Sequence, residues 1–307
     1  MIIARLSILL VALVAGGCLG GAVGPEPPLL IAQVQALRDK GHRALSRGDV
    51  ARAGRFFDEA RRLAESIDDR SGLAGALNDL GTTTGLQGDP GKAAEFHRQA
   101  HGIALELDDR ALIAESLSYR GQAAHLLGDH AAALAFYFQA LALAREVNDR
   151  LGEAIVLNNL GLLQQAKGEA EQAEQSFQRA LALNTELGER RAMASNLSNL
   201  GTLSEKRGHW AEARSLYEQA LALDKETEQR PAIEADLVNL GQLSEVEHRL
   251  EEAISFYDRA YRGYRVLNQV PKAVDVLTRL IRVLKATGQE SVAATYQTEL
   301  NTLTPRP

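Results

Sequence analysis

Apolar and small residues recur along this chain at intervals of 40 residues. Gly stands four positions after a recurring Leu in every interval but the last, where Ile281 replaces it, and Ala stands sixteen positions after the same Leu. A fixed period of this length, with no insertion over seven units, predicts a solenoid of stacked repeats. The recurring leucines are Leu37, Leu77, Leu117, Leu157, Leu197, Leu237 and Leu277.

Each unit contains two predicted helices separated by a short turn. In the second unit the pattern predicts a helix over about residues 73–86. Gly88 ends it, because Gly readily takes the left-handed conformation that follows a helix. Asp89 is placed to cap the next helix and Pro90 to begin it, and this helix reaches about Leu107. The same turn recurs as Gly48–Asp49, Gly128–Asp129 and Gly168–Glu169.

Small and large residues are spaced for close packing of these helices. Gly81 follows Leu80 on the first helix of its unit and lets a neighbouring helix approach. On a second helix, Ala133, Tyr137 and Ala140 form an apolar stripe in which a large ring lies between two small residues. We therefore expect a core made from these recurring positions.

Composition agrees with the helical pattern. Ala and Leu dominate an apolar fraction of 45%, aromatic residues make up only 5%, and Ala and Leu lose least on entering a helix. The formal net charge is −6, so the chain lacks the basic footprint of a nucleic-acid-binding protein. We expect an all-α protein whose partners do not include nucleic acids.

The pattern Leu–x–x–Leu–Gly followed by Ala–x–x–x–Phe/Tyr–x–x–Ala resembles the tetratricopeptide repeat. Its length resembles the 40-residue form of kinesin light chains, Pins-type polarity proteins and bacterial peptide-sensing regulators. The resemblance implies a right-handed superhelical solenoid of about seven helix–turn–helix units, with about fourteen helices over residues 33–303 and no sheet. The expected units are residues 33–70, 71–110, 111–150, 151–190, 191–230, 231–270 and 271–307.

Residues 1–17 are typical of an export signal peptide. Arg5 precedes an apolar run over residues 6–14, and small residues then lead to Cys18. The stretch Ala15–Gly16–Gly17–Cys18 resembles the lipobox of bacterial lipoproteins, in which the chain is cut before the Cys and the new terminus is acylated. This resemblance implies a membrane anchor at Cys18. The alternative is an uncleaved or ordinary signal peptide in which the Cys stands by chance.

Residues 18–32 are predicted to form a flexible tether between the anchor and the folded body. Pro25, Pro27 and Pro28 are expected to exclude a regular helix from this stretch. In Gram-negative lipoproteins an Asp after the Cys favours retention in the inner membrane, whereas this chain has Leu19. The resemblance thus implies an outer-membrane lipoprotein that faces the periplasm, with a periplasmic or cell-surface location as alternatives.

In tetratricopeptide arrays the first helix of each unit lines a concave groove, and the resemblance carries this role to the residues that follow the recurring Leu. Asn159, Asn199 and Asn239 share one such position in three successive units. An Asn amide offers a donor and an acceptor together, which suits the backbone of a bound peptide. The alternative is that these residues serve local bonding or packing.

Neighbouring groove positions give a mixed polar and apolar lining. The lining includes Thr202 and Gln242 one turn further along, and Asn158, Leu162 and Gln165 around Asn159. Such a surface suits a peptide or a helix better than one defined small molecule.

The last unit differs, because Arg279, Arg282 and Lys285 follow one another at intervals of three residues. They are placed to bind acidic side chains or a terminal carboxylate of a partner. The alternative is a solvated face on a capping helix.

Enzyme and metal signatures are missing from the folded region. His97 and His101 have a spacing that zinc sites use, but His97 stands at the aromatic packing position and no H-E-x-x-H motif accompanies it. Trp210 is likewise interpreted as a core residue. We expect no catalytic residue, no bound metal and no cofactor.

These observations favour a non-catalytic scaffold or adaptor that is lipid-anchored in a bacterial envelope and binds a peptide segment of a partner protein. The second hypothesis is a peptide-responsive regulator, since 40-residue arrays also form peptide receptors. Those receptors work in the cytoplasm, so the export signal argues against that hypothesis. An enzyme would need a catalytic domain for which the chain has no room.

Overall fold

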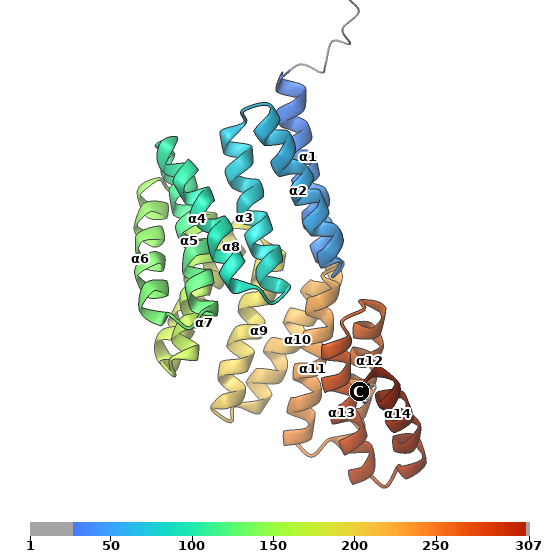
Figure 1. Ribbon diagram of the computed structural model, residues 1–307. Helices are drawn as coiled ribbons and strands as arrows, with labels where there is room; N and C mark the ends of the chain where they lie inside the picture. Colours follow the sequence, from blue (N-terminus) through green and yellow to red (C-terminus); the bar gives the residue numbers. More distant parts are fainter. Residues whose placement is uncertain (1–26, 305–307) are drawn as a thin grey trace, which may run out of the picture.

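The computed structural model describes residues 27–304, which form fourteen α-helices and no strand. The helices pair into successive hairpins that stack into a winding array (Figure 1). This confirms the predicted all-helical solenoid. The helices are α1 (Pro27–Ser46), α2 (Val50–Ser66), α3 (Arg70–Leu86), α4 (Pro90–Glu106), α5 (Arg110–Leu126), α6 (His130–Glu146), α7 (Arg150–Ala166), α8 (Ala170–Leu187), α9 (Arg190–Lys206), α10 (Trp210–Glu226), α11 (Arg230–Val246), α12 (Leu250–Val266), α13 (Val270–Ala286) and α14 (Glu290–Leu303).

The turns have the chemistry that the sequence predicts. Gly88 has a φ of 90°, and the side chain of Asp89 accepts a hydrogen bond from the backbone N–H of Lys92. Glu169 is an exception, because its side chain makes no capping hydrogen bond to α8. Helices α2 to α7 are each capped by an Asp side chain that accepts a hydrogen bond from a backbone N–H. These residues are Asp49, Asp69, Asp89, Asp109, Asp129 and Asp149.

The recurring Gly lies against the aromatic ring of the following helix in six units. A Cβ atom at Gly161 would stand only 2.6 Å from the ring of Phe177, so only Gly allows this approach. In the last unit Ile281 replaces the Gly and is itself buried. The Gly–ring pairs are Gly41–Phe57, Gly81–His97, Gly121–Tyr137, Gly161–Phe177, Gly201–Tyr217 and Gly241–Tyr257.

The N-terminal boundary differs from the predicted tether. Helix α1 begins at Pro27, so residues 27–32 are helical and the tether prediction is wrong for them. Proline is tolerated in a first helical turn because the N–H groups there have no partner within the helix. Cys18 and the rest of residues 1–26 lie outside the described residues. Within residues 27–304 no helix is both long and apolar enough to cross a bilayer.

Trp210 is not a core residue, contrary to the sequence-based interpretation. It is 44% exposed at the first position of α10, at the edge of the array. The packing position of that unit belongs to Tyr217, which is only 1% exposed. The two sites are seven residues apart, so the helical period alone places both on the same side, and only Tyr217 faces Gly201.

The array winds far enough for its first turn to meet a distant segment. A Cβ atom on Gly48, between α1 and α2, would lie 3.0 Å from the side chain of Leu267 and 3.4 Å from that of Pro231. The corresponding Gly88, Gly128 and Gly168 have no such neighbour within 4 Å. The α1–α2 hairpin therefore ends against the α10–α13 part of the array (Figure 1), and a cleft of about 970 Å³ lies at this junction.

Candidate protein-binding surface

The odd-numbered helices form the inner, concave face of the array. Successive odd-numbered helices contact one another across neighbouring units, as α5 and α7 do, and more closely than successive even-numbered helices. This is the arrangement that the resemblance implied for the first helix of each unit. The predicted groove residues on α7, α9, α11 and α13 accordingly lie on these inner helices.

The three Asn residues predicted to bind a peptide connect neighbouring units. Asn159 Nδ2 donates to Ser118 Oγ at 3.4 Å, and Asn239 Nδ2 donates to Ser198 Oγ at 3.3 Å. Asn199 Nδ2 donates to Asn158 Oδ1 at 3.0 Å. One amide hydrogen of each Asn thus supports the stacking of repeats, and each residue is half-buried. The contribution of the amide oxygens to partner binding stays a prediction.

Asn158 belongs chiefly to an internal network. Its Oδ1 also accepts from Asn196 Nδ2 at 2.9 Å, and Asn196 Oδ1 accepts from Asn184 Nδ2 at 2.7 Å. Asn184 and Asn196 are buried between α8 and α9. The carbonyl of Asn158 is therefore already engaged by two donors within the fold.

Two hollows lie between α5 and α7 on the concave side. The first, of about 500 Å³, and the second, of about 370 Å³, are both lined by Gln122 and Asn159, so they meet at these two amides. Together they form one surface, which we call the α5–α7 groove. Its apolar residues include Leu112, Leu126, Leu151, Ile155 and Leu162.

The first hollow combines exposed apolar side chains with carboxylates. Leu151 and Ile155 are 42% and 46% exposed, which is high for large aliphatic side chains. Asp109, Glu115 and Asp149 contribute the charged groups of its lining. Glu115 is exposed at the surface of the hollow, and packing around its carboxylate desolvates it in part and raises its pKa; Arg38 opposes this effect, while nearby carboxylates add to it.

The second hollow has the opposite charge. Leu126, which is 59% exposed, and Leu162 supply its apolar side chains. Lys206 and His125 lie in the same lining, together with the predicted groove residue Gln165. Desolvation lowers the pKa of His125, and the nearby His130 lowers it further, so Lys206 carries the positive charge here at neutral pH.

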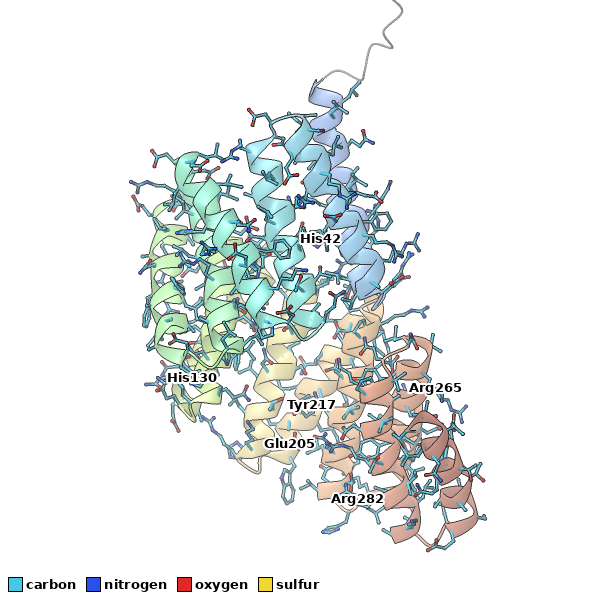
Figure 2. The ribbon with its side chains drawn as sticks, viewed as in Figure 1. His42, His130, Glu205, Tyr217, Arg265 and Arg282 are labelled. Atoms are coloured by element: carbon cyan, nitrogen blue, oxygen red, sulfur yellow. The ribbon has the colours of Figure 1, made fainter. Side chains whose placement is uncertain are left out.

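At the N-terminal end, the concave face is filled by its own ion pairs. Asp79 on α3 is only 3% exposed and accepts a hydrogen bond from Arg38 Nε at 2.6 Å. His42 on α1, labelled in Figure 2, has its Nε2 3.3 Å from the other carboxylate oxygen of Asp79. This stretch therefore offers fewer free polar groups than the α5–α7 groove.

The groove residues predicted on α9 and α11 are partly engaged. Thr202 donates to the backbone carbonyl of Ser198 at 3.0 Å, and its Oγ1 lies 3.2 Å from the hydroxyl oxygen of Tyr217. The same Tyr217 hydroxyl donates to Glu205 at 2.8 Å (Figure 2). Gln242 is half-buried at the equivalent position on α11.

At the C-terminal end, two of the three predicted basic residues already have acidic partners. Arg282, labelled in Figure 2, donates to both carboxylate oxygens of Glu245, at 2.9 and 2.8 Å, and so joins α13 to α11. Arg279 donates to Asp275 at 3.1 Å. Lys285 is exposed and makes no ion pair within residues 27–304. These pairs weaken the expected grip on an acidic partner, which stays a prediction.

His97 and His101 have separate structural roles. His97 is buried over Gly81, with its Nδ1 3.2 Å from Asn78 Oδ1, and its ring stacks on Tyr119. Burial lowers the pKa of His97 to about 4, so the ring is neutral at physiological pH. His101 Nδ1 lies 2.9 Å from Ser116 Oγ. Across residues 27–304 no group of three or more His, Cys, Asp or Glu residues is gathered for a metal ion.

Sequence reasoning missed Leu151, Ile155, Glu115 and Gln122. A signal was present, because Leu151 and Ile155 are large apolar residues at positions where the next unit has Arg191 and Ser195. They lie off the recurring apolar stripe, so they are not needed for the core. Apolar residues outside the repeating core pattern were the sequence feature that marked this surface.

Solved structures with similar folds come from several sources. BtubC (BKLC) from P. vanneervenii has a TM-score of 0.54 and 23% identity over 80% of this chain and 93% of its own. Aspartyl phosphate phosphatase F from Bacillus subtilis has a TM-score of 0.61 and 14% identity over 91% and 72%. The Rap conjugation gene regulator of plasmid pLS20, in complex with the Phr* peptide, has a TM-score of 0.69 and 14% identity over 94% and 79%.

The sequence itself matches a family model. None of the curated proteins matches this chain significantly. The model described as tetratricopeptide repeat matches residues 112–186, 152–226 and 192–266, which together span half of the chain. This match and the fourteen-helix array agree with the 40-residue pattern found in the sequence. The chain belongs to the tetratricopeptide repeat family.

Proposed function

We propose that this protein is a non-catalytic scaffold that binds a segment of a partner protein in the α5–α7 groove. The observation that carries the proposal is the pair of hollows joined at Gln122 and Asn159. Exposed aliphatic side chains in a concave surface favour association, because burying them removes apolar area from water. Two amides between them suit the backbone of a bound segment.

The fold supports a peptide or protein as the ligand. The similar Rap regulator of pLS20 is solved with the Phr* peptide, and another Rap protein with Competence and Sporulation Factor. Both structures share the helical array of this chain. The sequence contributes the absence of an enzyme motif in the folded region, which favours binding without catalysis.

We further propose that the scaffold is exported and lipid-anchored through Cys18 in a bacterial envelope. The support is the signal-like segment over residues 1–17 and the lipobox-like stretch that ends at the Cys. Two or three acyl chains would hold the protein on a membrane, since each buried CH₂ contributes about 0.8 kcal/mol. Cys18→Ser should release the protein from the membrane fraction or leave it uncut. Identical fractionation of the two proteins would overturn the anchor.

A peptide-responsive regulator is the second candidate, because the Rap regulator of pLS20 has a similar array and is solved with the Phr* peptide. Cell fractionation separates the two functions. A scaffold of the envelope should appear with the membranes, whereas a cytoplasmic pool that responds to an added peptide would favour the regulator.

Affinity capture tests the scaffold. The full chain, its Ile155→Ser variant and the control Val292→Ser should be used as baits in extracts of the cells that produce the protein. Val292 on α14 is 42% exposed, close to the exposure of Ile155, and lies outside the groove. We expect a partner that the wild type and the control retain and the Ile155 variant loses. The same captured proteins on all three baits would contradict the proposal.

A further inference from the structure

The hollow between Glu115 and Ile155 has charges of one sign. Its charged lining consists of Asp109, Glu115 and Asp149, and no Lys, Arg or His stands among the residues that line it. The nearby cation, Arg38, is held by Asp79 at 2.6 Å. This hollow is therefore an acidic site with an apolar wall.

The three carboxylates are not equivalent. Asp109 and Asp149 cap the N-termini of α5 and α7, and each accepts a hydrogen bond from a backbone N–H, at 3.0 Å from Leu112 and 2.9 Å from Gly152. Glu115 lies within α5, and its side chain makes no hydrogen bond or ion pair with any described residue. Its charge is thus free to meet a cation that enters the hollow.

The environment of Glu115 makes such a cation favourable. Partial desolvation raises the pKa of the exposed Glu115, and the carboxylates of Asp79, Asp109 and Asp149 raise it further. A bound ammonium or guanidinium would relieve this repulsion. A carboxylate in the same place would add to it.

The apolar wall defines the other half of the ligand. Leu112, Leu151 and Ile155 surround the hollow beside the carboxylates, and its volume of about 500 Å³ holds a large aliphatic or aromatic side chain. The opposite hollow, with Leu162 seven residues further along α7, lies roughly 10 Å away at 1.5 Å per helical residue. That hollow carries Lys206, so the positive charge of a ligand belongs at the Glu115 end.

Resting on the proposed function, we propose that the partner segment places a large apolar side chain against Ile155 and Leu151, with a Lys or Arg beside it that pairs with Glu115. The sequence had suggested an acidic segment at Arg279 and Arg282. Those guanidinium groups are already bound by Asp275 and Glu245. The carboxylate of Glu115 lies unpaired in the lining of the hollow itself, and it selects a basic segment.

Random dodecapeptides displayed on phage provide the test, with the immobilised full chain as bait. Enriched peptides should carry Lys or Arg within two positions of a large apolar residue. Ile155→Ser should lower the affinity for an enriched peptide, measured by fluorescence anisotropy, by roughly ten-fold or more, because apolar burial is lost. Glu115→Gln should weaken it by about two- to five-fold, and added salt should remove that difference.

Two controls match these changes. Val292→Ser removes an exposed apolar side chain and Glu251→Gln removes an exposed carboxylate on α12, and neither should alter peptide affinity. Two results would overturn the basic specificity and leave the proposed function standing. In the first, the enriched peptides bind Ile155→Ser more weakly but are acidic. In the second, they bind Ile155→Ser more weakly but bind Glu115→Gln as tightly as the wild type. A library that yields no enriched peptide, or only peptides indifferent to Ile155→Ser, would overturn both.

Discussion

The same repeat builds the α5–α7 and α11–α13 parts of the concave face, yet their side chains are used differently. In α11–α13, Arg282 binds Glu245, which also accepts the Tyr257 hydroxyl at 2.6 Å. In α5–α7, Glu115 has no partner among the described residues and Ile155 is 46% exposed. The recurring residues fix the core in both regions, and the variable residues decide whether the inner surface is closed by its own contacts or left open to a partner.

The buried polar pairs also differ between neighbouring units of the array. Between α8 and α9, Asn184 and Asn196 form a hydrogen-bonded pair. One unit later, between α10 and α11, Asp224 and Asp236 stand at the equivalent positions and are 4% and 2% exposed. Asp236 accepts a hydrogen bond from Ser198 through Oδ1, while its Oδ2 is buried without a partner. An amide pair is neutral at every pH, whereas the carboxylate pair is stable only while it holds a proton.

The largest expected effect is therefore a loss of stability as pH rises. Desolvation raises the pKa values of Asp224 and Asp236, and repulsion from Asp224 raises the pKa of Asp236 further. The unfolded chain releases this proton above about pH 4, but the folded chain keeps it until a higher pH. The free energy of unfolding should thus fall by up to about 1.4 kcal/mol per pH unit from pH 4 until the folded pair ionises.

Denaturant unfolding of the wild type and the Asp224→Asn/Asp236→Asn variant between pH 5 and 8 checks this. The variant copies the Asn184–Asn196 pair and should lack that contribution to the pH dependence. Parallel curves for the two proteins would show that the carboxylates are ionised in the folded state.

His97, next to the α5–α7 region, should give the opposite pH response. Burial lowers its pKa to about 4, below the value of about 6.5 in an unfolded chain. The unfolded chain therefore binds a proton first, and stability should fall as pH drops from 6.5 toward 4, by at most about 1.4 kcal/mol per unit. His97→Tyr, which restores the ring used in other units, should remove this acid sensitivity in thermal unfolding. An unchanged acid response would mean that the ring can be charged where it stands.

Matched Asn residues sharpen the comparison at the groove. Asn159 lines both hollows, whereas Asn239 holds the equivalent position on α11, and each donates to a Ser of the preceding unit. Asn159→Ala should weaken a groove-binding peptide by about two- to ten-fold, the range of one hydrogen bond. Asn239→Ala should leave that affinity unchanged. It should lower the free energy of unfolding by about as much as Asn159→Ala does. Isothermal titration with both variants decides this, and equal losses of affinity would extend the binding surface to α11.

Arg282 should give the smallest effect. Its side chain is 64% exposed in the ion pair with Glu245, so Arg282→Ala should change the free energy of unfolding by less than about 1 kcal/mol. Peptide affinity in the α5–α7 groove should change by less than about two-fold, because the pair lies outside that groove. A large loss of affinity would restore the basic end of the array as a binding site.

The sequence predicted the fold well because the information was repeated in every unit. The Leu, Gly and Ala positions specify the helices and their contacts, and Asp89 and Gly88 specify a turn, independently of distant residues. Trp210 was wrongly predicted to be buried. Periodicity shows which face of a helix a residue occupies, but it does not show that the first turn of α10 lies at the exposed edge of the array. The start of α1 was predicted too far along the chain, because prolines were taken to exclude a helix that they can in fact begin.

The candidate site was less predictable, because it depends on which groups remain without a partner. Asn159 was found from its register, but its bond to Ser118 joins residues 41 positions apart, and sequence alone does not show it. The ion pair of Arg282 with Glu245 likewise crosses from one unit to the next. Glu115 became a candidate only once the structure showed it beside the exposed Ile155.

Site-specific photo-crosslinking in the cells that produce the protein tests the central claim most directly. A photoreactive phenylalanine analogue at position 155 probes the α5–α7 groove, and the same analogue at position 279 probes the α13 surface. The open groove predicts a partner crosslink at position 155 that is absent or much weaker at position 279. A crosslink at position 279 alone, or equal yields at the two positions, would contradict the assignment of binding to the α5–α7 groove.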